Sequence, residues 1–303
     1  MGFISDQLDK RSFLYGLFKY SIYLLLLSNI LLFFRDEWLA SSHLFTGNIP
    51  LEEILKTFNT TIDTLVWTIL LILFEMETWI LSDEALKNNL LKNSLLTIRS
   101  LCYIAIIMVC YNYVLRLGMF YDISPMDVGD ICSLAGQDWS YIDRVNGYSS
   151  LTAENCPTFQ GKELFALNHY TLFANADTIQ KTQQLAWTDV INSSSWLLIV
   201  AILEIEVWYQ VKQIVFKPLI KTFLFIKTII YITMLACAIY WGIDGSFLEF
   251  WDAMLWILAF VFIELNLFQW QEEILERSRK RRRQKNNRAA SASADIPKEQ
   301  SQL

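Results

Sequence analysis

Ionisable side chains recur inside the most apolar segments of this sequence. They are acids and bases within runs long enough to cross a bilayer: Lys19, Glu75, Glu77, Arg99, Glu204, Glu206, Lys227 and Glu264. An unpaired charge at the centre of a membrane helix costs roughly 2.5–3.5 kcal/mol even on a lenient insertion scale. These groups therefore need partners or water. In membranes such residues carry protons or cations, or they pair helices through buried ion pairs.

The acids belong to a spacing that occurs three times. Each copy has Asp or Asn, then Trp four residues later, Glu at twelve, Glu or Asn at fourteen and an aromatic residue at sixteen. The copies are Asp63–Trp67–Glu75–Glu77–Trp79, Asn192–Trp196–Glu204–Glu206–Trp208 and Asp252–Trp256–Glu264–Asn266–Phe268. No copy needs a gap, which predicts an internal repeat.

The bases follow a matching pattern in the intervening apolar runs. Each is followed by Tyr one helical turn later, in the pairs Lys19 and Tyr23, Arg99 and Tyr103, and Lys227 and Tyr231. The repeating unit is therefore a hairpin of two helices. All three hairpins run in the same direction, so an axis along the membrane normal relates them, and alternating access by inverted halves is disfavoured.

Helical geometry separates the roles of the two acids in one copy. At about 100° per residue, Glu75 and Glu77 point about 200° apart, so they cannot both meet one base. We expect one to face its own hairpin and the other to face the next hairpin. The result is a ring of alternating bases and acids, weakest in the third copy, where Asn266 replaces a glutamate.

A polar face also follows from the spacing. Trp67 and Glu77 fall within about 40° of Asp63 on the helical wheel. If this face turns toward a central axis, two rings result: an outer one of Asp63, Asn192 and Asp252, and an inner one of Glu77, Glu206 and Asn266. Such rings are typical of a pathway for cations or protons.

The alternative reading of the same residues is a structural clamp. In a clamp, the acids and bases hold the three hairpins together, and the Trp and Tyr residues lie at the membrane interfaces as aromatic belts. Trp79 and Trp208, near the inner boundary, fit this arrangement well.

Six apolar runs must position these residues. The composition, 54% hydrophobic with a mean hydropathy of +0.31, indicates lipid as the main solvent. The expected spans are 12–34, 60–81, 96–118, 187–210, 219–242 and 250–271. The predicted fold is an all-α membrane protein whose six transmembrane helices form three parallel hairpin repeats. It divides into helices 1–3 (1–118), an extracytoplasmic cap (119–186), helices 4–6 (187–272) and a basic, mostly disordered tail (273–303).

The distribution of bases orients these spans, because short loops rich in Lys and Arg stay in the cytoplasm. The basic positions that share one side are Lys10, Arg11, Lys87, Lys92, Lys212, Lys217 and the run 277–288. Both termini are therefore expected in the cytoplasm, with the chain integral to a plasma or inner membrane. The basic run serves topology and attraction to anionic lipid, and nucleic acid is not expected as a partner.

The cap is expected to be a small folded unit, because about seventy residues exceed an ordinary loop. Cys132 and Cys156 bracket a polar stretch on the side that permits disulfides, so we expect them to form one. Residues 163–187 lack Gly and Pro and are expected to run as helix into the fourth span.

Several kinds of chemistry lack the residues that they need. The only histidines, His43 and His169, fall in outer loops, so no span supplies paired imidazoles for haem or metal. The sequence has no phosphate-binding glycine loop, no nucleophile elbow and no Cys-x-x-Cys. We expect no cofactor or metal, nominate no catalytic residue and disfavour an enzyme.

Two functions are left open by the sequence. The first is a small channel or transporter for protons or monovalent cations that uses the intramembrane acids and bases. The alternative is a non-conducting scaffold or assembly protein, in which the ion pairs are clamps and the cap contacts a protein partner.

Overall fold

The computed structural model describes residues 2–44, 51–77, 81, 88–144, 147–211 and 217–263. The structure is mostly helical, at 76%. Within these ranges, four helices are long and apolar enough to cross a membrane, over Gly16–Ser41, Asn89–Met119, Ala176–Glu206 and Thr222–Asp244. The chain is thus compatible with an integral membrane protein.

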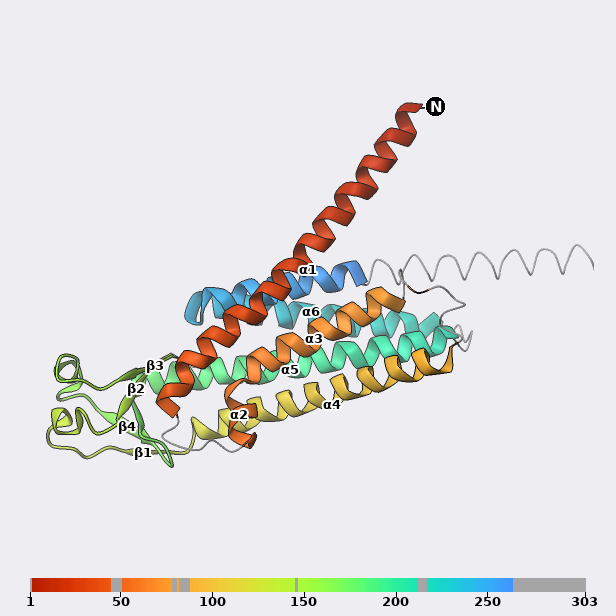
Figure 1. Cartoon of the computed structure of the whole chain (residues 1–303). Coiled ribbons are helices and arrows are strands. Elements are labelled where there is room, and N and C mark those ends of the chain that lie inside the picture. The colour runs from red at the N-terminus through yellow and green to blue at the C-terminus, as the bar shows by residue number, and fades with distance from the viewer. Residues whose placement is uncertain are drawn as a thin grey trace, which may run out of the picture.

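The long helices form a bundle in chain order. The helices are α1 (Gly2–Leu44), α2 (Leu51–Thr57), α3 (Asn59–Glu75), α4 (Asn89–Met119), α5 (Ala176–Val211), α6 (Lys217–Asp244) and a further helix over 247–263. Helix α1 packs on α3, α3 on α4, α4 on α5, and α5 on α6. Figure 1 shows them side by side, with α1 crossing the others obliquely.

The 247–263 helix closes this bundle against α1. The Asn29 side-chain amide donates a 2.7 Å hydrogen bond to Asp252, and the rings of Phe18 and Phe262 meet edge to face at 5.8 Å. One central core takes buried apolar residues from α1, α3, α4, α5, α6 and the 247–263 helix. The first and last described helices are therefore neighbours.

Side-chain caps explain where three helices begin. Asn88 accepts a hydrogen bond from the Leu90 amide at the start of α4. Glu37 of α1 accepts from the Thr60 and Thr61 amides at 2.8 and 3.0 Å, so it caps α3 from a neighbouring helix. Ser246 and Glu249 form a reciprocal capping box before the 247–263 helix.

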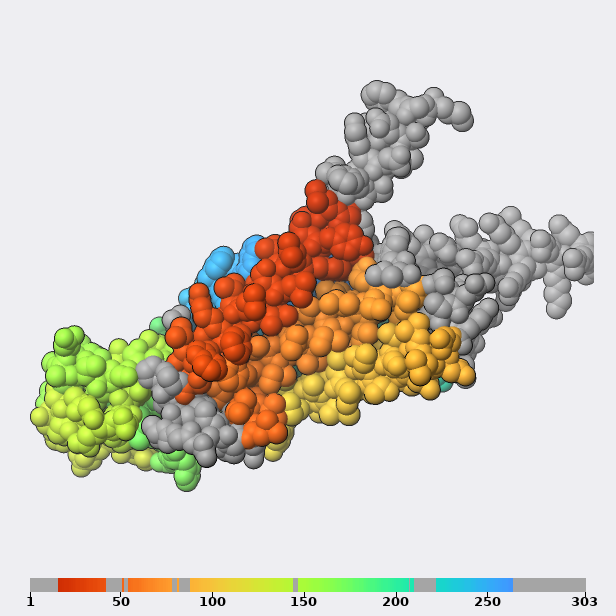
Figure 2. Space-filling model, in the orientation of Figure 1, coloured from red at the N-terminus to blue at the C-terminus, as the bar shows by residue number. Residues whose placement is uncertain are grey.

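The segment between α4 and α5 folds as a small sheet. The strands are β1 (Ile123–Pro125), β2 (Ser140–Arg144), β3 (Gly147–Ser150), β4 (Leu164–Leu167) and β5 (Leu172–Asn175), in the order β1-β4-β5-β2-β3. All pairs are antiparallel except β2 with β5. The Cys132–Cys156 disulfide joins the short 3-10 helices η3 (Ile131–Leu134) and η4 (Cys156–Phe159), which confirms the expected bridge. Figure 2 shows this unit, in green, at one end of the bundle.

The sheet corrects two expectations. The fold is not all-α, and the expected helix over 163–187 is wrong, because β4 and β5 occupy its first half and α5 begins only at Ala176. The turn between β4 and β5 contains His169, whose φ of 70° is left-handed. A non-glycine residue thus makes the reversal. Because this segment lacks Gly and Pro, its sequence gives no ordinary turn signal.

The expected six spans are met in part. Helix α3 and the 247–263 helix each contain 17 described residues, one turn or more shorter than the four candidate spans. Helix α1 extends beyond the expected 12–34 at both ends. Residues 264–272 of the expected sixth span and the expected basic tail, 273–303, lie outside the described residues.

Candidate functional site

Lys19 and Glu75 form the most buried ion pair between described helices. Lys19 Nζ of α1 lies 2.7 Å from both carboxylate oxygens of Glu75 of α3. The Tyr23 hydroxyl donates a further hydrogen bond of 2.9 Å to Glu75. The exposed fractions of the two charged side chains are 5% and 10%. Helix α1 is therefore tied to α3 by this ion pair and by the hydrogen bond from Tyr23.

The second acid of each pair contacts the helix that follows. Glu77 pairs with Arg99 of α4, and Glu206 pairs with Lys227 of α6 at 3.0 Å. Glu204 instead accepts a hydrogen bond from Tyr103 of the preceding α4. Acids two residues apart thus bond to opposite neighbours, and all these contacts lie between adjacent helices.

The other predicted residues of this set have different outcomes. Tyr231 packs against the central core, while Trp208 is 54% exposed and stacks edge-on with Tyr209. Trp79, Glu264 and Asn266 lie outside the described residues. The structure therefore describes the contacts of the predicted ring from Lys19 to Lys227. The contacts of Glu264 and Asn266, which would close the ring, lie outside the described residues.

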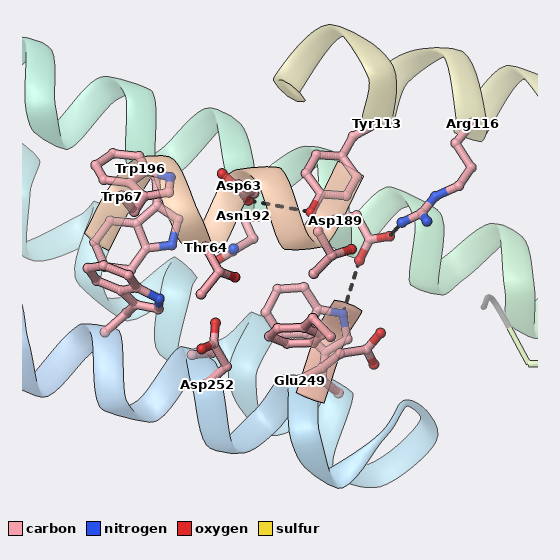
Figure 3. Close-up of a pocket in the computed structure, with 15 residues that line it drawn as sticks. Asp63, Thr64, Trp67, Tyr113, Arg116, Asp189, Asn192, Trp196, Glu249 and Asp252 are labelled. Carbon is pink, nitrogen blue, oxygen red and sulfur yellow. Dashed lines mark hydrogen bonds and ion pairs between the residues drawn. The ribbon is translucent and has the colours of Figure 1, made fainter. Parts of the chain in front are cut away.

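The three outer polar residues meet in one pocket, which we call the chamber. Asp63 comes from α3, Asn192 from α5 and Asp252 from the 247–263 helix. Figure 3 shows Asp63 and Asp252 reaching the cavity from opposite sides. The cavity volume is about 70 Å³, which is room for a few water molecules.

The three tryptophans of the predicted repeat pack together beside these polar groups. Their ring centroids lie 5.7 Å (Trp67–Trp196), 6.3 Å (Trp67–Trp256) and 6.5 Å (Trp196–Trp256) apart. Phe260 packs on Trp196 at 4.6 Å. Trp67 and Glu75 are eight residues apart on α3, about 12 Å along the axis. The indoles therefore separate the chamber from the level of the ion pairs.

The chamber carboxylates are held by neutral donors. The Tyr113 hydroxyl donates to Asp63 at 3.4 Å, and Asn29 donates to Asp252 at 2.7 Å. Within the described ranges, neither carboxylate forms an ion pair with a lysine or arginine. Two acids thus face one cavity without a base to neutralise them.

A third acid of the chamber is neutralised, and the sequence analysis missed its partner. Arg116 of α4 pairs with Asp189 of α5 at 2.8 Å, and the Trp241 indole donates to Asp189 at 3.2 Å. A signal for Asp189 was present, because it precedes Asn192 by one helical turn, as Glu249 precedes Asp252.

A wider pocket of about 520 Å³, which we call the vestibule, adjoins the chamber. The two share Phe33, Thr60 and Glu249 in their walls. The vestibule is bounded by the C-terminal part of α1, by the turn before the 247–263 helix and by strands β2 and β3. Its charged lining consists of Arg35, Asp36, Glu37, Asp143 and Glu249. Burial raises the pKa of Tyr148, in the same wall, to about 12, so this phenol is neutral at physiological pH.

The charges along both pockets favour cations. Arg35 pairs with Asp36 at 2.9 Å, and Arg116 pairs with Asp189, so each base already has an acid. Among the described residues, the pocket acids that pair with no base are Glu37, Asp63, Asp143, Glu249 and Asp252. A cleft lined by one sign of charge concentrates ions of the opposite sign.

In the part of the chain that the structure describes, no three His, Cys, Asp or Glu side chains are grouped closely enough to hold a metal ion. His169 is exposed and lies 3.9 Å from Asp122, outside the chamber and the vestibule.

The chain matches no protein-family model, no curated protein and no solved structure. Function must therefore be inferred from the chemistry of the chamber, the vestibule and the ion pairs.

Proposed function

We propose that this chain is an integral membrane protein that takes a cation from the vestibule into the chamber and moves monovalent cations or protons across the bilayer. The proposed architecture has six spans in three parallel hairpins, with α3 and the 247–263 helix as the second and sixth. The ion pairs at the other level clamp the hairpins together.

The observation that carries the proposal is the pair Asp63 and Asp252. They come from helices far apart in sequence, line one chamber and have neutral hydrogen-bond donors as their only described polar contacts. Acids placed in this way inside a bilayer mark ion or proton paths by default, because a purely structural acid is better stabilised by a base.

The lining of the chamber supports the threefold arrangement. Phe33, Tyr113 and Trp241 all contribute to its wall. Each lies fourteen residues after the base of its own helix, Lys19, Arg99 or Lys227. Together with the three tryptophans and the Asp–Asn–Asp set, these residues support the proposal that equivalent positions of all three hairpins surround one cavity. In the proposed arrangement the chamber lies on the repeat axis, which is the geometry expected of a path.

Two features support an orientation with the cap and vestibule outside. The Cys132–Cys156 disulfide lies in the cap, and disulfides persist in oxidising compartments. The basic loops and the run 277–288 belong to the opposite side of the proposed spans, which the positive-inside rule assigns to the cytoplasm. That run would also attract anionic lipid.

The packed indoles make this conformation closed. Trp67, Trp196 and Trp256 are each 7–8% exposed and pack against one another in the wall of the chamber. A bound cation could therefore pass beyond the chamber only after this aromatic layer is displaced. The geometry fits a gated channel or a transporter with an occluded state better than an open pore.

The test is flux into proteoliposomes that contain purified protein. Proton, Na⁺ and K⁺ uptake under an imposed gradient is compared between wild type, Asp63→Asn and Asp252→Asn at matched incorporation. The matched control is Glu163→Gln, which neutralises an exposed cap acid outside both pockets. We expect at least a tenfold loss of flux in the two chamber variants alone. Wild type that is folded and shows no flux under any gradient or voltage would overturn the proposal.

The second candidate is a non-conducting scaffold. The observation that favours it is that Lys19, Arg99 and Lys227 each pair with an acid of an adjacent helix. Such pairs hold a bundle together without any path, and the cap would then bind a protein partner. Exchanging the charges of Lys19 and Glu75 distinguishes the readings: a scaffold requires that the double exchange restores the expression lost in either single change, with no flux in wild type.

A further inference from the structure

Thr64 carries a buried hydroxyl with no partner in the described structure. Thr64 is 3% exposed, lies one position after Asp63 and contributes to the chamber wall. Figure 3 shows its hydroxyl directed into the cavity, between Asn192 and Asp252. A buried hydroxyl without a hydrogen bond costs free energy, so a ligand that satisfies it gains by binding.

From this geometry we propose that the chamber is a binding site for a small primary alkylammonium ion. The inference rests on the proposed function and names the class of cation that the same site takes. An ammonium group has three N–H donors. Asp63, Asp252 and the Thr64 hydroxyl are three acceptors around one cavity, so each donor has a partner.

The floor of the chamber suits the rest of such an ion. The Trp67, Trp196 and Trp256 rings present apolar and aromatic surface beside the carboxylates. Tryptophan is the side chain that attracts cations most strongly through its ring, and it also covers an alkyl chain. A bare alkali ion would gain nothing from the apolar part of this surface.

The size of the cavity limits the chain length. A volume of about 70 Å³ holds a few atoms of the size of water oxygen. Methylammonium and ethylammonium meet this limit. Tetramethylammonium has no N–H donor and is bulkier, so it cannot satisfy Thr64 or the two carboxylates.

Chelated divalent metals do not compete well for the same groups. The described residues lack a third acid, histidine or cysteine close enough to complete a metal site. The remaining chamber acids are engaged, because Asp189 pairs with Arg116 and Glu249 caps its helix.

The experiment is calorimetric titration of the wild-type protein in lipid nanodiscs at constant ionic strength. The probes are ethylammonium chloride, potassium chloride and tetramethylammonium chloride, and tryptophan fluorescence gives a second readout from the chamber floor. We expect saturable binding of ethylammonium, with at least about tenfold weaker binding of the other two ions.

Two substitutions at one position identify the hydroxyl. Thr64→Val keeps the shape of the side chain and removes the hydroxyl that accepts an N–H of the ammonium ion. We expect it to weaken ethylammonium binding about tenfold or more, as for loss of a hydrogen bond to a charged group. Thr64→Ser keeps the hydroxyl and should bind as wild type does. Equal binding by the valine and serine variants would overturn the assignment of Thr64.

The remaining outcomes separate this inference from the proposed function. Binding of K⁺ as tight as that of ethylammonium, or persistent K⁺ or proton flux without any ethylammonium binding to folded protein, overturns the ligand class and leaves the transport proposal standing. Saturable ethylammonium binding that Thr64→Val weakens, in a protein that shows no flux of any cation, supports the site and overturns transport.

Discussion

The side-chain amide of Asn29 donates a 2.7 Å hydrogen bond to Asp252, joining α1 to the 247–263 helix across 223 residues of sequence. Asn29 is 1% exposed, so this bond lies inside the bundle. It links one wall of the chamber to the contact that closes the ring of helices. The same residue therefore supports both the fold and the geometry of a chamber carboxylate.

Replacing Asn29 by Leu should lower the free energy of unfolding by about 1–2 kcal/mol, because Asp252 loses a buried donor while the volume is kept. Denaturation by increasing sodium dodecyl sulfate in bicelles measures this difference. Ser28→Ala is the control, since Ser28 is exposed and its hydroxyl donates to the Leu24 carbonyl of its own helix. Equal stability of the Asn29 variant and the control would show that the bond does not close the bundle.

The ion pairs at the other level should differ in strength according to their burial. Lys19→Met leaves Glu75 charged and buried, so we expect a loss of about 3–5 kcal/mol. Arg99→Met should cost clearly less, because the Arg99 and Glu77 side chains are 30% and 28% exposed and water screens them.

A double-mutant cycle checks this reading. Lys19→Met combined with Glu75→Gln should recover part of the loss, because no uncompensated charge is left. Strictly additive losses in the two single variants would mean that the pair is not coupled and does not act as a clamp.

The cap should depend on its disulfide while the helix bundle does not. The Cys132–Cys156 bridge closes a loop with a sequence separation of 24, and loops of this size gain about 3 kcal/mol from cross-linking. Cys132→Ala with Cys156→Ala should therefore make the cap sensitive to protease, with unchanged helical content by circular dichroism.

The same cysteines report which side of the membrane the cap occupies. After reduction of intact cells, a membrane-impermeant maleimide should label Cys132, which is half-buried, whereas Cys102, Cys156 and Cys237 are buried. Labelling of Cys132 only after lysis would reverse the proposed orientation.

The spacing of the sequence was sufficient to group six of the residues that line the chamber, the Asp–Asn–Asp set and the three tryptophans. Asp63, Asn192 and Asp252 recur with Trp four residues later, and a strict period along straight helices keeps equivalent residues at one depth. The helical wheel likewise separates Glu75 from Glu77, and the structure pairs them with α1 and α4 respectively. These relations depend only on local helix geometry.

Other features depend on long-range contacts that carry no local pattern. The cap sheet pairs β1 with β4 and β2 with β5, which are separated in the sequence. Its strands are also too short to give a recognisable sequence pattern. Arg116 and Asp189 do not follow the threefold spacing. The positions that match Arg116 in the other two copies are not bases, and the positions that match Asp189 are not both acids. Thr64 is an ordinary helix residue until the cavity beside it is known.

Removing one indole should open the floor of the chamber. Trp196 contacts Trp67, Trp256 and Phe260, so it is one of the residues that hold the aromatic layer together. Trp196→Ala leaves a cavity that water can enter from the chamber. If the layer is the closed gate of a cation path, the variant should leak K⁺ or protons into proteoliposomes at least about tenfold faster than wild type. Trp208→Ala removes an exposed tryptophan at the level of the ion pairs and should leave the rate unchanged. A folded Trp196→Ala protein as tight as wild type would mean that the axis beyond the indoles is packed throughout, and that the charges below it serve only to hold the hairpins together.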